Sequence, residues 1–296
     1  GARNQDGSPR YSLLQQGAGL VDAYAAVYAT ETGCANRGLD IAKDDEMLAD
    51  PEWSPLARRS QLVGAARERA EQATGVRTGI ILTGIRTIEP EHSMELAKLA
   101  VAWKGRGVVG FDLAGAEEHY PAKDHRQAFY HVMNHNQNST IHAGEGFGPE
   151  SIHQALHRCG ANRIGHGTRL EEDKDLMYYV ADMRIPLEIC LSSNLQSCVV
   201  DDLSHHPFRY YLRKGLRVTL NTDNTLFART SPVQELRLAV DTYDLTLLEA
   251  EHLILNGFKS AFLPEREKGK MILDVIATFA SLRDKFGLDA KMAGTL

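Results

Sequence analysis

The feature that most constrains the fold of this sequence is a regular alternation of short apolar runs and amphipathic stretches, starting near residue 60. Apolar runs lie at residues 78–84, 107–113, 139–142, 163–165, 186–190 and 216–221. Helical periodicity lies at residues 58–72, 93–104, 123–134, 149–159, 173–183 and 207–214. Continuous apolar strands separated by helices are typical of a parallel sheet covered on both faces. The alternation therefore predicts an α/β fold with six recognisable βα units.

Polar and ionisable residues follow directly after these predicted strands. They are Asp112, His142, His166, residues 192–194 and Asp223. In a doubly wound sheet such residues would be spread along an edge. In a barrel the carboxyl ends of all strands meet at one mouth, so residues far apart in sequence converge. We therefore expect a (β/α)8 barrel of the TIM type, incomplete in that about six units are recognisable.

The first 55 residues lack this alternation. Residues 21–32 predict a helix, residues 42–56 are acidic and rich in turn formers, and no convincing strand is present. The sequence therefore predicts two parts, an atypical N-terminal segment at 1–55 and a barrel body at 56–296.

Charge and cysteine usage restrict the partners and the compartment. The chain has 33 Lys and Arg against 39 Asp and Glu, a net charge of -6, which disfavours nucleic acids and anionic membranes as partners. Its four cysteines form no C-x-x-C pair, which is typical of reduced and mostly buried thiols. No apolar stretch is long enough to span a bilayer, and no leader is recognisable. These features indicate a cytoplasmic protein and leave its oligomeric state open.

Three motifs place a metal ligand or a proton-transfer group directly after a strand. They are HAGE at 142–145, GHG at 165–167 and NTDN at 221–224. Imidazole and carboxylate ligands suit Zn2+, which lowers the pKa of bound water to about 7. Glu145 could then act as an acid or base beside that water. Each motif alone has a structural explanation, such as a helix cap or a packed histidine. Together they favour hydrolytic chemistry.

The residues around these motifs resemble the adenosine deaminase family of metal-dependent (β/α)8 hydrolases. Five segments occur in the family's order and spacing: GFDLAGAE at 110–117, TIHAGEGFGPESI at 140–152, RIGHGTRLEED at 163–173, LEICLSSNLQS at 187–197 and LRVTLNTDNTL at 216–226. The similarity extends from about residue 60 to about residue 280. The resemblance implies the hydrolytic deamination of adenosine or 2'-deoxyadenosine to inosine and ammonia, with one zinc ion per chain.

The resemblance also implies roles for individual residues. His142 and Asp223 correspond to zinc ligands, and Asp223 also binds the attacking water. Glu145 corresponds to the group that protonates N1 of the purine while water adds to C6. His166 corresponds to the histidine that orients and deprotonates that water. Two further positions correspond to substrate contacts, Gly115 at the N3 edge and Asn224 at N7.

Two departures from the family pattern leave alternatives open. Most members carry a second Asp where this chain has Asn224, although an amide can also donate to N7. Members begin with an H-x-H pair that adds two zinc ligands, and none of the 12 histidines here forms one. The alternatives are an inactive truncated or fused relative, a deaminase of a modified adenosine, and a deaminase of adenine, which the SSNLQS segment disfavours. Residues 1–44 faintly resemble the end of a subtilisin-like peptidase domain.

Overall fold

The computed structural model of the chain describes residues 55–288. The predicted helix at 21–32 and the peptidase-like segment therefore lie outside the described residues. The chain divides into two compact units. Of the described residues, one unit holds 55–80 together with Val101–Val108, and the other holds Ile81–Ala100 together with 109–288. The first unit contains α4 (Pro55–Thr74), and the second contains all the site residues discussed below.

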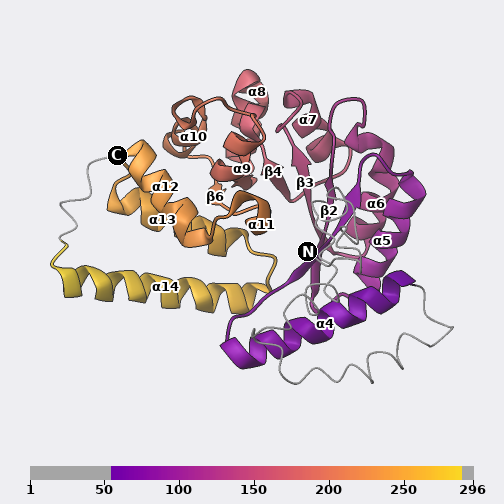
Figure 1. The fold of residues 1–296 in the computed structure, drawn as a ribbon, viewed down its shortest axis with the longest axis horizontal. Helices are drawn as coiled ribbons and strands as arrows, with labels where there is room; N and C mark the ends of the chain where they lie inside the picture. The colour runs from indigo at the N-terminus through magenta and orange to yellow at the C-terminus, as the bar shows by residue number, and fades with distance from the viewer. Residues whose placement is uncertain (1–54, 289–296) are drawn as a thin grey trace, which may run out of the picture. The chain divides into compact units, whose positions relative to one another are not determined.

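The described strands form one six-stranded sheet whose strand order follows the sequence, from β1 to β6 (Figure 1). The strands are β1 (Ile80–Ile85), β2 (Val108–Ala114), β3 (Asn138–Ala143), β4 (Arg163–His166), β5 (Leu187–Ile189) and β6 (Val218–Leu220). All pairs from β2 to β6 are parallel. Each lies at a position predicted from the apolar runs, which confirms the α/β expectation and an incomplete (β/α)8 fold.

Helices follow each strand, as the periodicity predicts. They are α5 (Pro90–Ala102), α6 (Arg126–Asn134), α7 (Pro149–His157), α8 (Lys174–Asp182), α9 (Leu191–Gln196), α10 (Phe208–Arg213), α11 (Thr225–Ala228), α12 (Pro232–Tyr243), α13 (Leu247–Ser260) and α14 (Glu265–Phe286). Short 3-10 turns lie at η1 (Ala122–His125), η2 (Thr168–Glu172) and η3 (Leu203–His205). Helix α9 was not expected, because its sequence LSSNLQ is short and mostly polar, and α11 to α14 lie beyond the last predicted helix. None of the described helices is long and apolar enough to cross a lipid bilayer.

The core lies on both faces of the sheet. Phe111 and Leu113 on β2, Ile141 on β3 and Ile164 on β4 have fully buried side chains. Phe111 also packs against Phe129 of α6, with ring centroids 5.1 Å apart. Burial on both faces explains why the strands read as continuous apolar runs rather than as alternating ones. Cys159 and Cys190 are buried free thiols and Cys198 is exposed, in line with reduced, mostly buried cysteines.

Tyr211 joins α10 to the turn after β4. Its buried hydroxyl donates to the carbonyl of Thr168 at 2.9 Å and accepts the N–H of Glu171 at 2.8 Å. We expect Tyr211→Phe to lower the free energy of unfolding by about 1–3 kcal/mol, because a buried N–H loses its partner. The neighbouring Tyr210 is 38% exposed, so Tyr210→Phe is the matched control. Urea denaturation with equal losses in the two variants would contradict this role for the hydroxyl.

Candidate functional site

His142 stands at the carboxyl end of β3, where Asp112 of β2 fixes its ring. The ring Nδ1 lies 3.0 Å from one carboxylate oxygen of Asp112 and 3.1 Å from the other. Burial alone would lower the pKa of His142, but the Asp112 carboxylate outweighs it and raises that pKa to about 10. A histidine whose Nδ1 is held by a carboxylate presents Nε2 outward, as metal-ligating histidines do.

Arg86 is a buried cation that contacts the backbone of His142. Its guanidinium donates to the carbonyl of His142 at 2.6 Å and to the carbonyl of Tyr120 at 2.8 Å. Burial lowers the pKa of Arg86, while the nearby carboxylates of Glu117 and Asp112 oppose that effect. Arg86 thus balances two buried acids and ties the end of β1 to β3.

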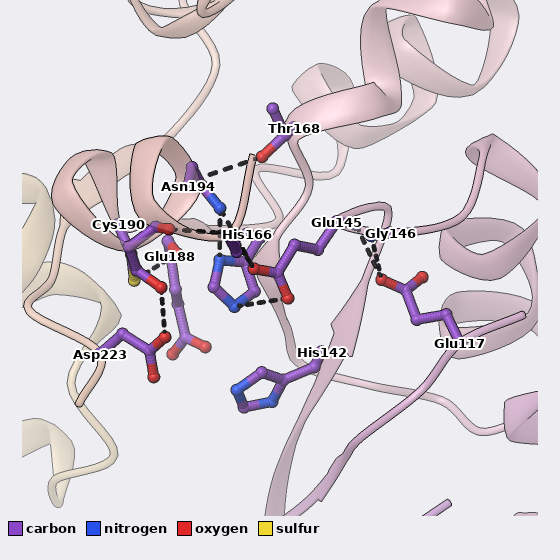
Figure 2. Close-up of polar contacts among 12 residues, drawn as sticks. Glu117, His142, Glu145, Gly146, His166, Thr168, Glu188, Cys190, Asn194 and Asp223 are labelled. Carbon is purple, nitrogen blue, oxygen red and sulfur yellow. Dashed lines mark hydrogen bonds and ion pairs between the residues drawn. The ribbon is translucent and has the colours of Figure 1, made fainter. Parts of the chain in front are cut away.

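Glu117 holds the loop that follows His142. Its carboxylate accepts the backbone N–H groups of Gly144, Glu145 and Gly146 at 2.8, 2.8 and 3.0 Å (Figure 2). Gly144 adopts φ +70°, and a side chain there would collide with Ile152. Three successive N–H groups pointing at one anion fix the loop backbone. The glycine and the carboxylate together determine where Glu145 projects.

Glu145 points toward His166 and α9 (Figure 2). One carboxyl oxygen lies 3.4 Å from Nε2 of His166. The other accepts from the Asn194 amide and the Ser197 hydroxyl, each at 3.4 Å. Burial raises the pKa of Glu145, followed by repulsion from Asp223 and Glu117, against the opposing charge of His142. The protonated form is therefore favoured more than in an ordinary glutamate.

His166 ends β4 in a left-handed conformation, with φ +60°. Such backbone is uncommon for a residue with a side chain, and such strained residues cluster at functional sites. Its ring is buried, 5.2 Å from the ring of His142 between centroids, and its Nδ1 lies 3.1 Å from the Asn194 amide. Burial and then the charge of His142 lower the pKa of His166 to about 4. It is therefore a neutral imidazole at neutral pH.

Asp223 follows β6, also with positive φ, at +50°. Its carboxylate accepts from the Ser193 hydroxyl at 2.7 Å, and its charge raises the pKa of both His142 and Glu145. The fully buried Glu235 of α12 supports this corner, since it accepts from the Ser192 N–H at 3.3 Å and the Thr230 hydroxyl at 2.7 Å. It thereby joins the start of α9 to the loop after β6.

The remaining two predicted site residues lie on the loops that follow β2 and β6. Gly115 has φ +102°, and a side chain there would touch Ile85 at 3.5 Å. Asn224 starts α11, where its side-chain oxygen accepts the Phe227 N–H at 3.2 Å. The structure thus brings four predicted residues into one cluster, namely His142, Glu145, His166 and Asp223. Gly115 and Asn224 flank the ends of β2 and β6.

Sequence reasoning missed three residues of this site: Arg86, Glu117 and His206. It noted Asp112 and Asn194 only as polar residues after strands. Asp112 and Glu117 lie in GFDLAGAE and Asn194 in SSN, so a polar residue within a strand-end motif was the available signal. His206 lies before α10, where its Nδ1 accepts the Phe208 N–H at 3.0 Å. Its second contact, with Asn194, had no sequence signal.

The donors present fit a metal ion only in part. His142 has an oriented ring and Asp223 supplies a carboxylate, both suitable for Zn2+. Among residues 55–288, no group of three or more His, Cys, Asp or Glu side chains is arranged to hold a metal ion. Catalytic zinc commonly has three protein ligands. Among the described residues, His142 and Asp223 therefore offer two donors suited to a metal ion.

Comparison with known proteins places these features among characterised relatives. The sequence profile of the family described as adenosine deaminase matches residues 55–278. Adenosine deaminase 1 of Streptomyces coelicolor is 37% identical over 294 residues, covering 90% of this chain and 73% of that protein. The adenosine deaminase of Mycobacterium ulcerans is 40% identical over 276 residues, covering 85% and 75% of the two chains.

Two solved structures are similar to this chain over most of its length. The adenine deaminase of Arthrobacter aurescens superposes with a TM-score of 0.69 at 25% identity, covering 74% of this chain and 67% of its own. An amidohydrolase of Burkholderia ambifaria with bound zinc has a TM-score of 0.74 at 20% identity, covering 80% and 66%. This last likeness concerns the fold alone.

Proposed function

Because this chain belongs to the adenosine deaminase family of hydrolases, we propose that it converts adenosine or 2'-deoxyadenosine to inosine or 2'-deoxyinosine, releasing ammonia. The observation that carries the proposal is the cluster of His142, Glu145, His166 and Asp223 at the carboxyl ends of the parallel strands. In barrel enzymes the chemistry is performed at this end of the strands.

Glu145 delivers the proton that the reaction needs. Addition of water to C6 breaks the aromaticity of the purine, so N1 must gain a proton as the new C–O bond forms. The raised pKa of Glu145, caused first by burial, favours the protonated carboxyl group that this step needs. Glu117 holds the backbone at Glu145, which keeps that carboxyl in place.

His166 and Asp223 orient the attacking water in this proposal. Nε2 of His166 lies 3.4 Å from the Glu145 carboxyl, so a water molecule bound beside His166 would be close to the acid that protonates N1. The Ser193 hydroxyl restrains the Asp223 carboxylate. Restrained groups cost little reorganisation when charge develops on the attacking oxygen.

Gly115 and Asn224 are the proposed contacts to the purine edges. At Gly115 the absence of a side chain and the positive φ allow the backbone to approach a planar ring. The Asn224 oxygen accepts a backbone N–H, which turns its amide nitrogen the other way, where it can donate to N7. An amide serves this purpose without an altered pKa.

Zn2+ is the metal that we propose for this site, with His142 and Asp223 among its ligands. The zinc bound to the Burkholderia ambifaria protein of the same fold, and the Asp112-oriented ring of His142, support this choice. Bound zinc would lower the pKa of a water molecule to about 7. We also propose a small-molecule purine nucleoside as the partner and the cytoplasm as the location of the protein.

The test is the ultraviolet absorbance change as adenosine becomes inosine, measured with and without added zinc beside an Asp223→Ala variant. We expect turnover that needs zinc, near one zinc per chain by atomic spectroscopy, and loss of both turnover and bound zinc in the variant. Asp241, exposed on α12, provides the matched control Asp241→Ala.

A second candidate is a catalytically silent member of the family. The observation that favours it is the lack of an H-x-H pair in the 296 residues, together with the two-ligand donor set of the described part. Under this alternative the protein shows no turnover of adenosine or adenine at any zinc concentration. Such a result would overturn the proposed activity and leave the family membership intact.

A further inference from the structure

A continuous line of hydrogen bonds runs from the backbone of α10 to the ring of His166, whose Nε2 lies 3.4 Å from the carboxyl group of Glu145. The hydrogen-bonded members, in order, are the Phe208 N–H, the His206 ring, the Asn194 amide and the His166 ring. Figure 2 shows its inner part, with Asn194 beside His166 and His166 beside Glu145. The Asn194 amide and the two histidine rings could each be placed with donor and acceptor exchanged. The backbone N–H of Phe208 can only donate.

The direction of the line is set by a group that can only donate. The backbone N–H of Phe208 lies 3.0 Å from Nδ1 of His206, so Nδ1 must accept and carries no proton. Burial, followed by the charge of His166, lowers the pKa of His206 to about 4, so its ring is neutral at pH 7. Its one proton is therefore on Nε2, which donates to the Asn194 side-chain oxygen at 3.2 Å.

Asn194 passes this direction on, because all its hydrogen-bonding capacity is used. The residue is 0% exposed. Its oxygen accepts from His206 and from the Thr168 hydroxyl, the latter at 3.4 Å. Its nitrogen faces Nδ1 of His166 at 3.1 Å and Glu145 at 3.4 Å. Flipping the amide would set donor against donor at His206, so the nitrogen must donate to His166.

His166 therefore accepts at Nδ1 and carries its proton on Nε2, on the side of Glu145. We propose that Asn194 and His206 are positioning residues that hold His166 as the neutral tautomer protonated at Nε2. This inference rests on the function proposed above. The Nε2-protonated tautomer makes His166 a hydrogen-bond donor to the attacking oxygen, where negative charge develops. The resemblance implied instead that His166 deprotonates the water. Here neither ring nitrogen has a free lone pair for that.

The tautomer can be observed directly by long-range 15N–1H correlation NMR on protein labelled with 15N-histidine. The His166 signals are assigned by their loss in His166→Asn. We expect an unprotonated Nδ1 and a protonated Nε2 for both His166 and His206 at pH 7. A protonated Nδ1 on His166 in the wild-type protein would overturn the proposal, whatever the activity.

Asn194→Asp tests the direction of the line with almost no change in shape. The new carboxylate can accept from His206 and from a proton on Nδ1 of His166, so we expect the His166 tautomer to reverse. Thr168→Val is the matched control, because it removes one bond to the same oxygen but leaves His206 to orient the amide. An unchanged His166 tautomer in Asn194→Asp would show that Asn194 does not set the tautomer and would refute the proposal.

Two substitutions of His206 test whether its donor group orients the Asn194 amide. In His206→Gln the side-chain amide can still donate to Asn194, whereas His206→Leu cannot. We expect the His166 tautomer to be kept in the first and mixed in the second, with both folded by circular dichroism. Equal tautomer populations in the two variants would contradict the proposal.

Kinetics then separate this inference from the proposed function. If adenosine is turned over, we expect Asn194→Asp to lower kcat by about 10²–10³-fold, the loss typical of one missing donor to a developing oxyanion, while KM changes little. An unaltered kcat despite a reversed tautomer would refute the donor role. If no adenosine is turned over, the NMR result still decides the tautomer, because it needs neither zinc nor substrate.

Discussion

Glu145→Gln is expected to lower kcat for adenosine by about 10²–10⁴-fold, the range that general acid catalysis commonly contributes. The amide keeps the size of the side chain and can still bond to Asn194 and His166, but it cannot deliver a proton to N1. We expect KM to change only a few-fold, because substrate contacts are preserved. Steady-state kinetics followed by absorbance at fixed zinc concentration measure both constants.

The matched control is Glu150→Gln, which alters an exposed carboxylate at the start of α7, five positions away. Its kcat should equal that of the unaltered protein. Zinc content must be measured in both variants, so that a loss of metal is not mistaken for a loss of the acid. A Glu145→Gln protein with full zinc and a kcat within ten-fold of wild type would remove Glu145 from its proposed role.

Glu117→Gln is expected to lower the free energy of unfolding by about 2–4 kcal/mol and to reduce turnover as well. The Glu117 carboxylate accepts three backbone N–H groups, at Gly144, Glu145 and Gly146. A glutamine offers one oxygen, and its NH2 group would face an N–H, so at least one buried donor loses its partner. Each such loss costs about 1–3 kcal/mol, and bonds to a charged acceptor are among the strongest.

Urea denaturation and kinetics should be measured together for this variant. Glu118→Gln is the matched control, since the side chain of Glu118 is 69% exposed, with only His119 as a distant partner at 3.8 Å. We expect this control to change stability by less than about 0.5 kcal/mol. If the two variants were equally stable, the loop backbone would not depend on the Glu117 carboxylate.

The strands and the cluster of polar residues at their ends could be predicted from the sequence because both depend on local pattern. Buried parallel strands must be apolar throughout, and their polar ends then stand out, as at His142, His166 and Asp223. The segment LSSNLQ is different. It forms α9, where tertiary contacts hold it: the Ser192 N–H donates to Glu235, and the Asn194 amide contacts His166 and Glu145. Such anchoring leaves no periodic signal in six residues.

The supporting residues could not be predicted, because their partners are distant in sequence. Arg86 contacts the carbonyl of His142 across 56 positions, and Glu117 contacts Gly144 across 27. Every residue has a backbone carbonyl, and every residue except proline has a backbone N–H. No sequence motif therefore indicates which of these groups a side chain will bond. His206 shows the same limit, because nothing in the sequence indicates its bond to Asn194, 12 positions away.

Gly165 of β4 lies in register between His142 of β3 and Glu188 of β5. The Cβ of an alanine there would lie 3.0 Å from the Cα of His142, so even alanine would push against the backbone of His142. We expect a deep mutational scan to find this position nearly invariant, although glycine itself performs no chemistry. Variation that changes which purine is accepted would then accumulate in the loops beyond the strands, at positions such as Gly115 and Asn224. A lineage of such proteins can therefore exchange substrates while its reaction stays the same.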